Sequence, residues 1–167
     1  MEHKINGGVR YMIHDVLHNE FNIADKQVSF SVPAPVNDKK ALLEFDQLCA
    51  VLACSDQNLR ERLNVSSDLL EMAWEETLGS SDHEAVVTPC SFFDLLHSYS
   101  ADHVETYAVW RFLRTEIAHV FFKELKNHGR VVSFKAKDIK AVEAAKAAYC
   151  HSHPDGAEFC YVGDLLP

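Results

Sequence analysis

One uninterrupted stretch, residues 101–127, constrains the fold of this chain more than any other. It contains no Gly or Pro, and its apolar residues recur at spacings of three and four, the period of an amphipathic α-helix. These positions are Val104, Tyr107, Trp110, Leu113, Ile117, Val120, Phe121 and Leu125. Such a helix would be about 40 Å long, the width of a small domain. The pattern predicts one long central helix that ends at His128-Gly129, where Gly supplies a left-handed C-terminal residue.

Shorter patterns surround this helix. They predict helices over 9–21 and from Asp38 through Leu52, a helical pair within 57–78, a short helix from Ser91, and a helix over 138–150. Strands are predicted at 28–32, 131–134 and 159–162. The last two strands and the helix between them have the size of a βαβ unit. We therefore expect an α+β protein with a predominantly helical body, a small two- or three-stranded sheet, and one domain over 1–167.

Length and composition point to a compact cytoplasmic protein. The chain has 167 residues, 47% of them hydrophobic, and no apolar run approaches the ~20 residues that a membrane-spanning helix needs. The first ten residues lack a hydrophobic signal region. Five cysteines form no dense framework, which indicates free thiols in a reducing compartment. We expect no membrane association and no cofactor.

The formal charge of −9 is unevenly distributed. Residues 111–146 hold nine Lys and Arg against four Asp and Glu, a net +5, so the rest of the chain carries −14. That acidic remainder argues against general DNA binding, because contact with phosphates requires concentrated positive charge. The basic segment is either a local surface for nucleic acid or an acidic partner, or it neutralises the acidic part across the fold. The second alternative is the simpler one.

The helical pair within 57–78 has the spacing of a helix-turn-helix, with 64–66 as its turn. Its second helix would be the one that enters a DNA groove, but it carries no Lys or Arg. It carries four acidic residues instead: Asp68, Glu71, Glu75 and Glu76. We therefore interpret the pair as packed helices with Trp74 in the core, and the four acids as a surface for a protein partner with a basic surface.

Arg114 and His119 form the sharpest catalytic pattern in the chain, Arg-x4-His. The pattern resembles the Arg-x4–6-His element of the HEPN superfamily, helical-bundle proteins that include ribonucleases. The resemblance implies that Arg114 stabilises phosphate charge and that His119 acts in acid–base cleavage of RNA. In a regular helix these positions are about 140° apart. They would therefore need a helix break or a second copy of the chain to meet, which makes a homodimer possible under this hypothesis.

A second pattern, His151-x-His153-x10-Asp164, lies near the C-terminus. Its spacing, with Ser152-His153-Pro154, resembles the zinc-ligand element of JAMM metalloproteases. The resemblance implies a three-ligand zinc site at His151, His153 and Asp164, with both histidines on one side of a strand.

Other catalytic fingerprints are absent: the sequence has no Gly-rich phosphate loop and no nucleophile elbow. The leading hypothesis is therefore a small acidic protein that acts by binding a protein partner, in an accessory, immunity or inhibitor role, without catalysis of its own. The alternatives are a metal-independent ribonuclease that uses Arg114 and His119, and a zinc site at 150–164.

Overall fold

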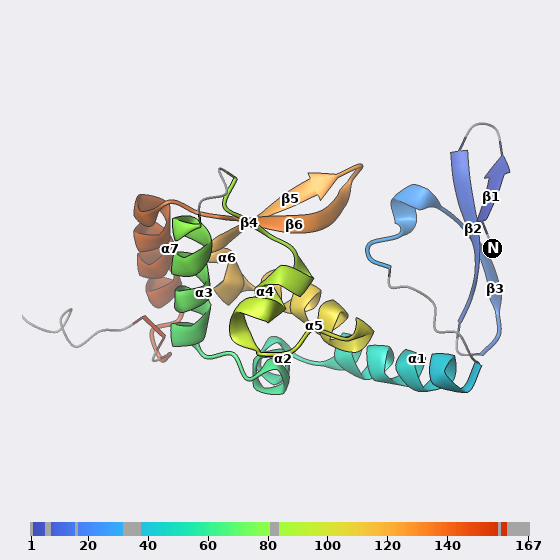
Figure 1. Ribbon diagram of the computed structural model, residues 1–167, viewed down its shortest axis with the longest axis horizontal. Helices are drawn as coiled ribbons and strands as arrows, with labels where there is room; N and C mark the ends of the chain where they lie inside the picture. The colour runs from blue at the N-terminus through green and yellow to red at the C-terminus, as the bar shows by residue number, and fades with distance from the viewer. Residues whose placement is uncertain are drawn as a thin grey trace, which may run out of the picture.

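The computed structural model describes residues 2–5, 8–15, 17–31, 38–80, 84–156 and 158–159 (Figure 1). Within them the chain forms helices and two three-stranded antiparallel sheets, which confirms the α+β class. The first sheet has the order β1-β2-β3 and the second the order β4-β6-β5. None of the described helices is both long enough and apolar enough to span a membrane.

The predicted long central helix is wrong beyond Leu113. Helix α5 (His103–Leu113) ends there, the short α6 (Glu116–His119) follows, and strand β5 (Phe122–Asn127) pairs with β6 (Arg130–Ala136). The break lies at Thr115, which is extended (φ −76°, ψ 160°) and whose buried hydroxyl donates to the carbonyl of Phe112 at 2.6 Å. A hydroxyl that bonds the backbone in this way competes with the helical ladder.

The residues taken for the end of the long helix form a hairpin turn instead. His128 (φ 50°) and Gly129 (φ 82°) are both left-handed, between the paired residues Asn127 and Arg130. Two left-handed central residues define the type I′ turn that joins antiparallel strands. Glycine is favoured both there and after a helix, so its presence did not distinguish the two structures.

Helix α5 is nevertheless the spine of the core. It packs against α1 (Asp38–Ala53), α2 (Asp56–Leu63) and α4 (Pro89–Leu96). Its residues Phe112 and Leu113 are fully buried, and Phe92 of α4 packs its ring on Phe112. On the other side, the indole Nε1 of Trp110 donates to the carbonyl of Val131 at 2.9 Å, which ties the helix to β6.

The predicted helix over 9–21 is also wrong, because these residues form a β-hairpin. Strands β2 (Gly8–His14) and β3 (Glu20–Ala24) are antiparallel, with β1 (Glu2–Ile5) on the other edge of β2. The carboxylate of Asp15 accepts from the backbone N–H groups of Leu17 and Asn19, which stabilises a turn there. The 3-10 helix η1 (Asp25–Gln27) follows, and residues 28–31, expected in a strand, form no regular structure.

The C-terminal part agrees with the sequence up to the end of α7 (Ile139–Ser152), which follows β6. Strand β6 lies between β5 and β4 (Val86–Val87) and is antiparallel to both. The second strand of the expected βαβ unit falls at 159–162; Phe159 is in a turn, and 160–162 lie outside the described residues. The helical pair within 57–78 is confirmed as α2 and α3 (Ser67–Gly79), with Trp74 buried.

Arg111 fastens α1 onto α5. Its Nη1 donates to the carbonyls of Val51 and Leu52, the latter at 2.9 Å, at the C-terminal end of α1, where carbonyls lack helical partners. We expect Arg111→Met to lower the free energy of unfolding by about 1.5–3 kcal/mol, because charged hydrogen bonds are lost. Denaturant unfolding measures this, and hydrogen exchange should show α1 opening first.

Arg62→Met is the matched control, since Arg62 is exposed on α2 and has no ion pair within the described residues. Its effect should stay within about 0.5 kcal/mol. Equal effects of the two substitutions would contradict the role of Arg111.

Candidate functional site

Helices α4 and α5 form a helix-turn-helix that is followed by a β-hairpin. Thr88 and Asp102 cap the two helices, each in a reciprocal capping box, which fixes where both begin. Strand β4 precedes α4 and hydrogen-bonds to β6, which follows α5. The sheet β4-β6-β5 therefore joins the segments before and after the two helices. The order is thus strand, two helices, then hairpin. The pair α2 and α3, whose spacing also resembles a helix-turn-helix, precedes this arrangement in the chain.

The second helix of this pair is covered by the chain itself. No residue of α5 is exposed. Phe30 packs its ring on Trp110 and Tyr107, with ring centroids 5.0 and 5.5 Å apart, and His103 lies 3.5 Å from the carboxylate of Glu44 on α1. In helix-turn-helix proteins the second helix enters the DNA major groove. Here α1 and Phe30 contact α5 on its outer side, and none of its residues is more than partly exposed.

Within the described residues, the hairpin β5–β6 carries two opposed lysines that have no ion pair. Lys123 and Lys135 are directly opposite each other and exposed, next to the pair Leu125 and Ser133. We call these four residues the outer hairpin face. Alternate residues, among them Phe122 and Phe134, are buried against the helices. Among the described residues, neither lysine has a carboxylate within ion-pair distance.

Arg114 and His119 meet at a third residue, Glu124. The Nε of Arg114 lies 3.2 Å from Oε1 of Glu124, and Nε2 of His119 donates to the same oxygen at 3.1 Å. The guanidinium of Arg114 also lies over the ring of Trp110, 4.7 Å from its centroid. The two residues were expected to meet only if the helix broke between them or a second chain took part, and the chain does leave the helix after Leu113. A carboxylate that fixes the histidine tautomer leaves Nδ1 to accept a proton, so acid–base chemistry is geometrically possible here.

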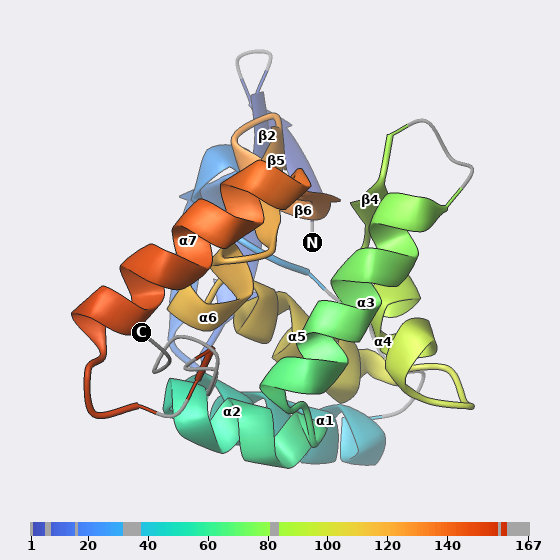
Figure 2. The ribbon, with the colours of Figure 1, turned by 90° about the vertical axis from the view of Figure 1, so that its left-hand side faces the viewer.

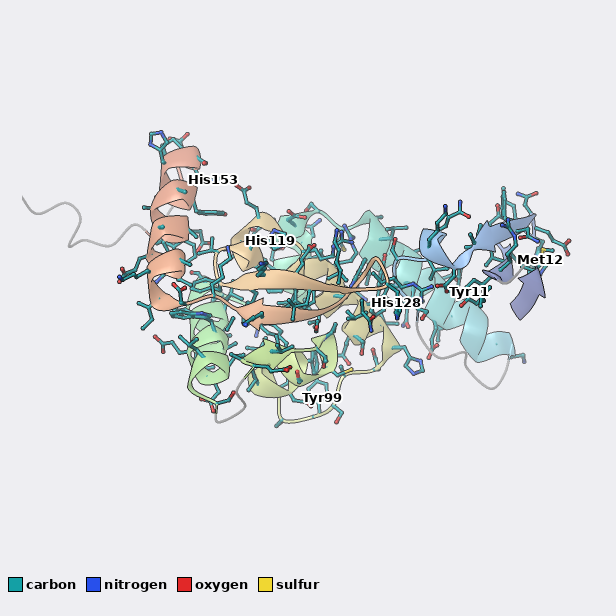
Figure 3. The ribbon with its side chains drawn as sticks, turned by 90° about the horizontal axis from the view of Figure 1, so that it is seen from above. Tyr11, Met12, Tyr99, His119, His128 and His153 are labelled. Atoms are coloured by element: carbon teal, nitrogen blue, oxygen red, sulfur yellow. The ribbon has the colours of Figure 1, made fainter. Side chains whose placement is uncertain are left out.

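Lys137 contacts the backbone of the cluster formed by Arg114, His119 and Glu124. Its Nζ donates to the carbonyl of His119, and its own carbonyl accepts from Nε1 of Trp74 at 2.8 Å. Burial lowers the pKa of Lys137, because desolvation disfavours the charged ammonium. Lys137 therefore connects the backbone of His119 to Trp74 of α3. Figure 3 shows His119 beside the strands of hairpin β5–β6.

The predicted zinc ligands do not form a site in the described residues. His151 lies within α7, so it and His153 do not share one side of a strand. His153 donates from Nδ1 to the carbonyl of Tyr149 at 3.0 Å, and its Nε2 lies 3.4 Å from Glu116. Asp164 lies outside the described residues, and no group of three metal-ligating side chains occurs within them.

The four acids of the predicted partner surface all lie on α3, but they differ in exposure and in ion pairing. Glu71 is half-buried and forms a salt bridge with Lys146 of α7, so its charge is compensated within the fold. Figure 2 shows α3 and α7, the two helices that this salt bridge joins. Asp68, Glu75 and Glu76 are exposed and have no ion-pair partner among the described residues. The surface is therefore reduced to three unpaired carboxylates on one helix.

The contacts of Glu124 and of the opposed lysines were not predicted from the sequence, for one reason. A helix over 101–127 would keep Lys123 away from Lys135. The hairpin register instead places these two lysines opposite each other, and the helix break lets Glu124 reach Arg114 and His119. The signal that could have found them is Asn127-His-Gly-Arg130 between two stretches rich in lysine, a pattern typical of a hairpin turn.

The comparison with protein families agrees with this arrangement. Residues 58–141, half of the chain, match the family model described as ribonuclease II, winged helix domain. The match spans α2 to β6 and includes the helix-turn-helix and the hairpin. The chain matches none of the curated proteins and none of the solved structures with which it was compared.

Glu124→Gln tests whether the carboxylate joins the two cationic side chains. Because Arg114 and His119 are each about two-fifths exposed, we expect a loss of about 0.5–1 kcal/mol in unfolding free energy. A double-mutant cycle with Arg114→Ala should show that the two losses do not add. Glu116→Gln is the control, since that side chain is 65% exposed beside His153. Additive losses would show that the cluster is not coupled.

Proposed function

The chain belongs to the family of ribonuclease II winged helix domains, and on this premise we propose that it is an RNA-binding module without catalysis of its own. The outer hairpin face contacts the sugar–phosphate backbone, with Lys123 and Lys135 as its cations. The family match supports a role connected with nucleic acid. RNA is chosen over DNA because the name of the family refers to a ribonuclease.

The observation that carries this proposal is the pairing of Lys123 with Lys135. Like charges directly opposite on neighbouring strands destabilise a sheet. Neither lysine is offset by a carboxylate within the described residues, although the chain is acidic overall. Bound phosphate would remove the repulsion and release counterions, which is the principal source of affinity for nucleic acid.

The burial of helix α5 bears on whether the proposed RNA binding depends on base sequence. Phosphate contacts position a protein, whereas contacts with base edges specify the sequence. Since α1 and Phe30 contact the outer side of α5, this helix is not available for a groove. The module therefore binds without sequence preference.

Lys123→Gln with Lys135→Gln should weaken RNA binding and leave the fold unchanged or more stable. With labelled single-stranded RNA, the slope of log affinity against log salt should fall by about 0.7 for each lysine removed. Loss of the repulsion should raise the unfolding free energy by a few tenths of a kcal/mol. Fluorescence anisotropy and denaturant unfolding give the two measurements on the same samples.

Lys39→Gln is the matched control, because Lys39 is exposed on α1, away from the hairpin. An unchanged salt slope in the double variant would contradict the proposal. The recovered RNA should be intact after incubation without metal. Cleavage that disappears in both Arg114→Ala and His119→Ala would instead support the ribonuclease hypothesis.

A second candidate function is binding of a protein partner with a basic surface. The observation that favours it is the exposed, unpaired state of Asp68, Glu75 and Glu76 on α3. Such a surface speeds association with a partner of opposite charge.

Glu75→Lys with Glu76→Lys should abolish recovery of such a partner in affinity capture from host extract, because attraction becomes repulsion. Recovery with the unaltered chain should fall as salt is raised. Asp94→Lys, an exposed acid reversed on α4, is the control. A partner retained equally by all three proteins would sink this candidate.

A further inference from the structure

A groove of about 420 Å³ lies between α3 and α7. Figures 1 and 2 both show these two helices next to each other. The residues that line the groove recur at spacings of three and four on each helix, so one face of α3 and one face of α7 form its walls. They include Trp74, Glu75 and Leu78 of α3, and Ile139, Val142 and Glu143 of α7. The volume is in the range of binding sites, about 300–1,000 Å³.

The floor of the groove is apolar. Trp74 and Val142 are buried, whereas Leu78 is half-buried and Ile139 is 59% exposed. The indole Nε1 of Trp74 donates to the carbonyl of Lys137 at 2.8 Å, which holds the ring in place. Covering the exposed part of Ile139 would remove apolar surface from water. An apolar side chain of a ligand is therefore favoured against this floor.

The charged residues of the groove leave two carboxylates without an ion pair. Lys146 is the one cation among the described residues that line the groove, and it forms a salt bridge with Glu71. Its Nζ also lies 5.6 Å from the ring centroid of Phe121, so its charge is engaged within the fold. Glu75 and Glu143 are exposed and have no ion pair within the described residues. The groove thus carries an excess of negative charge.

The end of α3 adds to this negative potential. The helix ends at Gly79, which lines the groove, and the C-terminal carbonyls of a helix carry partial negative charge. A Lys or Arg in the last turn ordinarily offsets that charge, but α3 has none there, and Glu75 and Glu76 lie close to the turn instead. A cation at this end of the groove would therefore be stabilised both by side chains and by the helix end.

From these observations we propose that the groove between α3 and α7 binds a segment of a partner protein in which basic side chains flank aliphatic ones. The proposal deepens the second candidate function and rests on it. The aliphatic side chains lie on Leu78 and Ile139, and the basic side chains contact Glu75 and Glu143. Carboxylates from two helices, with apolar surface from both, match a peptide that presents cationic and apolar groups together. RNA is disfavoured in the groove, because its phosphates would meet these carboxylates.

The probe is the peptide acetyl-Ala-Arg-Leu-Leu-Arg-Ala-amide, titrated calorimetrically into the whole chain. It should bind with one-to-one stoichiometry and at least about tenfold more tightly than the analogue with Gln in place of both Arg, because two ion pairs are lost. The analogue with Ser in place of both Leu should bind at least about fivefold more weakly than the probe, because apolar contact is lost. Equal affinity for the three peptides, or no binding of the probe at millimolar concentration, would overturn the proposal.

Variants of the chain locate the binding site. Glu75→Gln with Glu143→Gln should weaken binding of the probe about tenfold. Ile139→Ser should weaken it about fivefold. Glu76→Gln and Met72→Ser are the matched controls, since both change exposed residues of α3 outside the groove, and each should alter the affinity less than about twofold. Losses in the controls as large as those in the groove variants would place the peptide elsewhere on the surface.

Glu75→Arg with Glu143→Arg tests direct contact with the basic side chains. This variant should lose the probe and bind the analogue with Glu in place of both Arg, because opposite charges then face each other again. Binding of neither peptide, with an unchanged circular dichroism spectrum, would contradict direct contact. The titrations require no recovered partner, so a failed affinity capture from host extract would count against the second candidate function alone, and failed titrations against the groove.

Discussion

The structure depends on the burial of α5 on every side. Its inner residues form the core with α4 and the sheet, and its outer side is closed by α1 through the hydrogen bonds of Arg111 and by Phe30 through ring contacts. A helix in this place in a helix-turn-helix is ordinarily the part that meets nucleic acid. Because this helix packs against its own chain, the proposed RNA contacts are assigned to other elements.

The break after α5 determines which elements those are. Thr115 ends the helix, and the chain returns as a hairpin whose inner residues complete the core and whose outer residues include two unpaired lysines. The same break lets Glu124 reach both Arg114 and His119, residues that a continuous helix would hold apart. The change of backbone direction after Leu113 thus produces both the outer hairpin face and the ion pairs of Glu124 with Arg114 and His119.

Among the described residues, two exposed lysines without an ion pair lie opposite each other on β5 and β6, and three exposed carboxylates without an ion pair lie on α3. Glu71 and Lys146 join α3 to α7 as a neutral pair. The sequence-based alternative in which the basic segment neutralises acidic residues describes Lys146, and the alternative of a binding surface stays a prediction. Lys146 neutralises an acid across the fold, while Lys123 and Lys135 remain open to an external anion.

The residue pattern was sufficient to predict helices α1, α2, α3 and α7 and strand β6. The helices follow from apolar spacing, and the strand follows from β-branched and aromatic residues after Gly129. The pattern could not distinguish helix from hairpin at 9–21 and 114–127, because short apolar spacings fit both and glycine is favoured at both kinds of ending. The candidate sites depended on that distinction, since strand register, cross-chain hydrogen bonds and the covering of α5 are contacts between residues far apart in sequence.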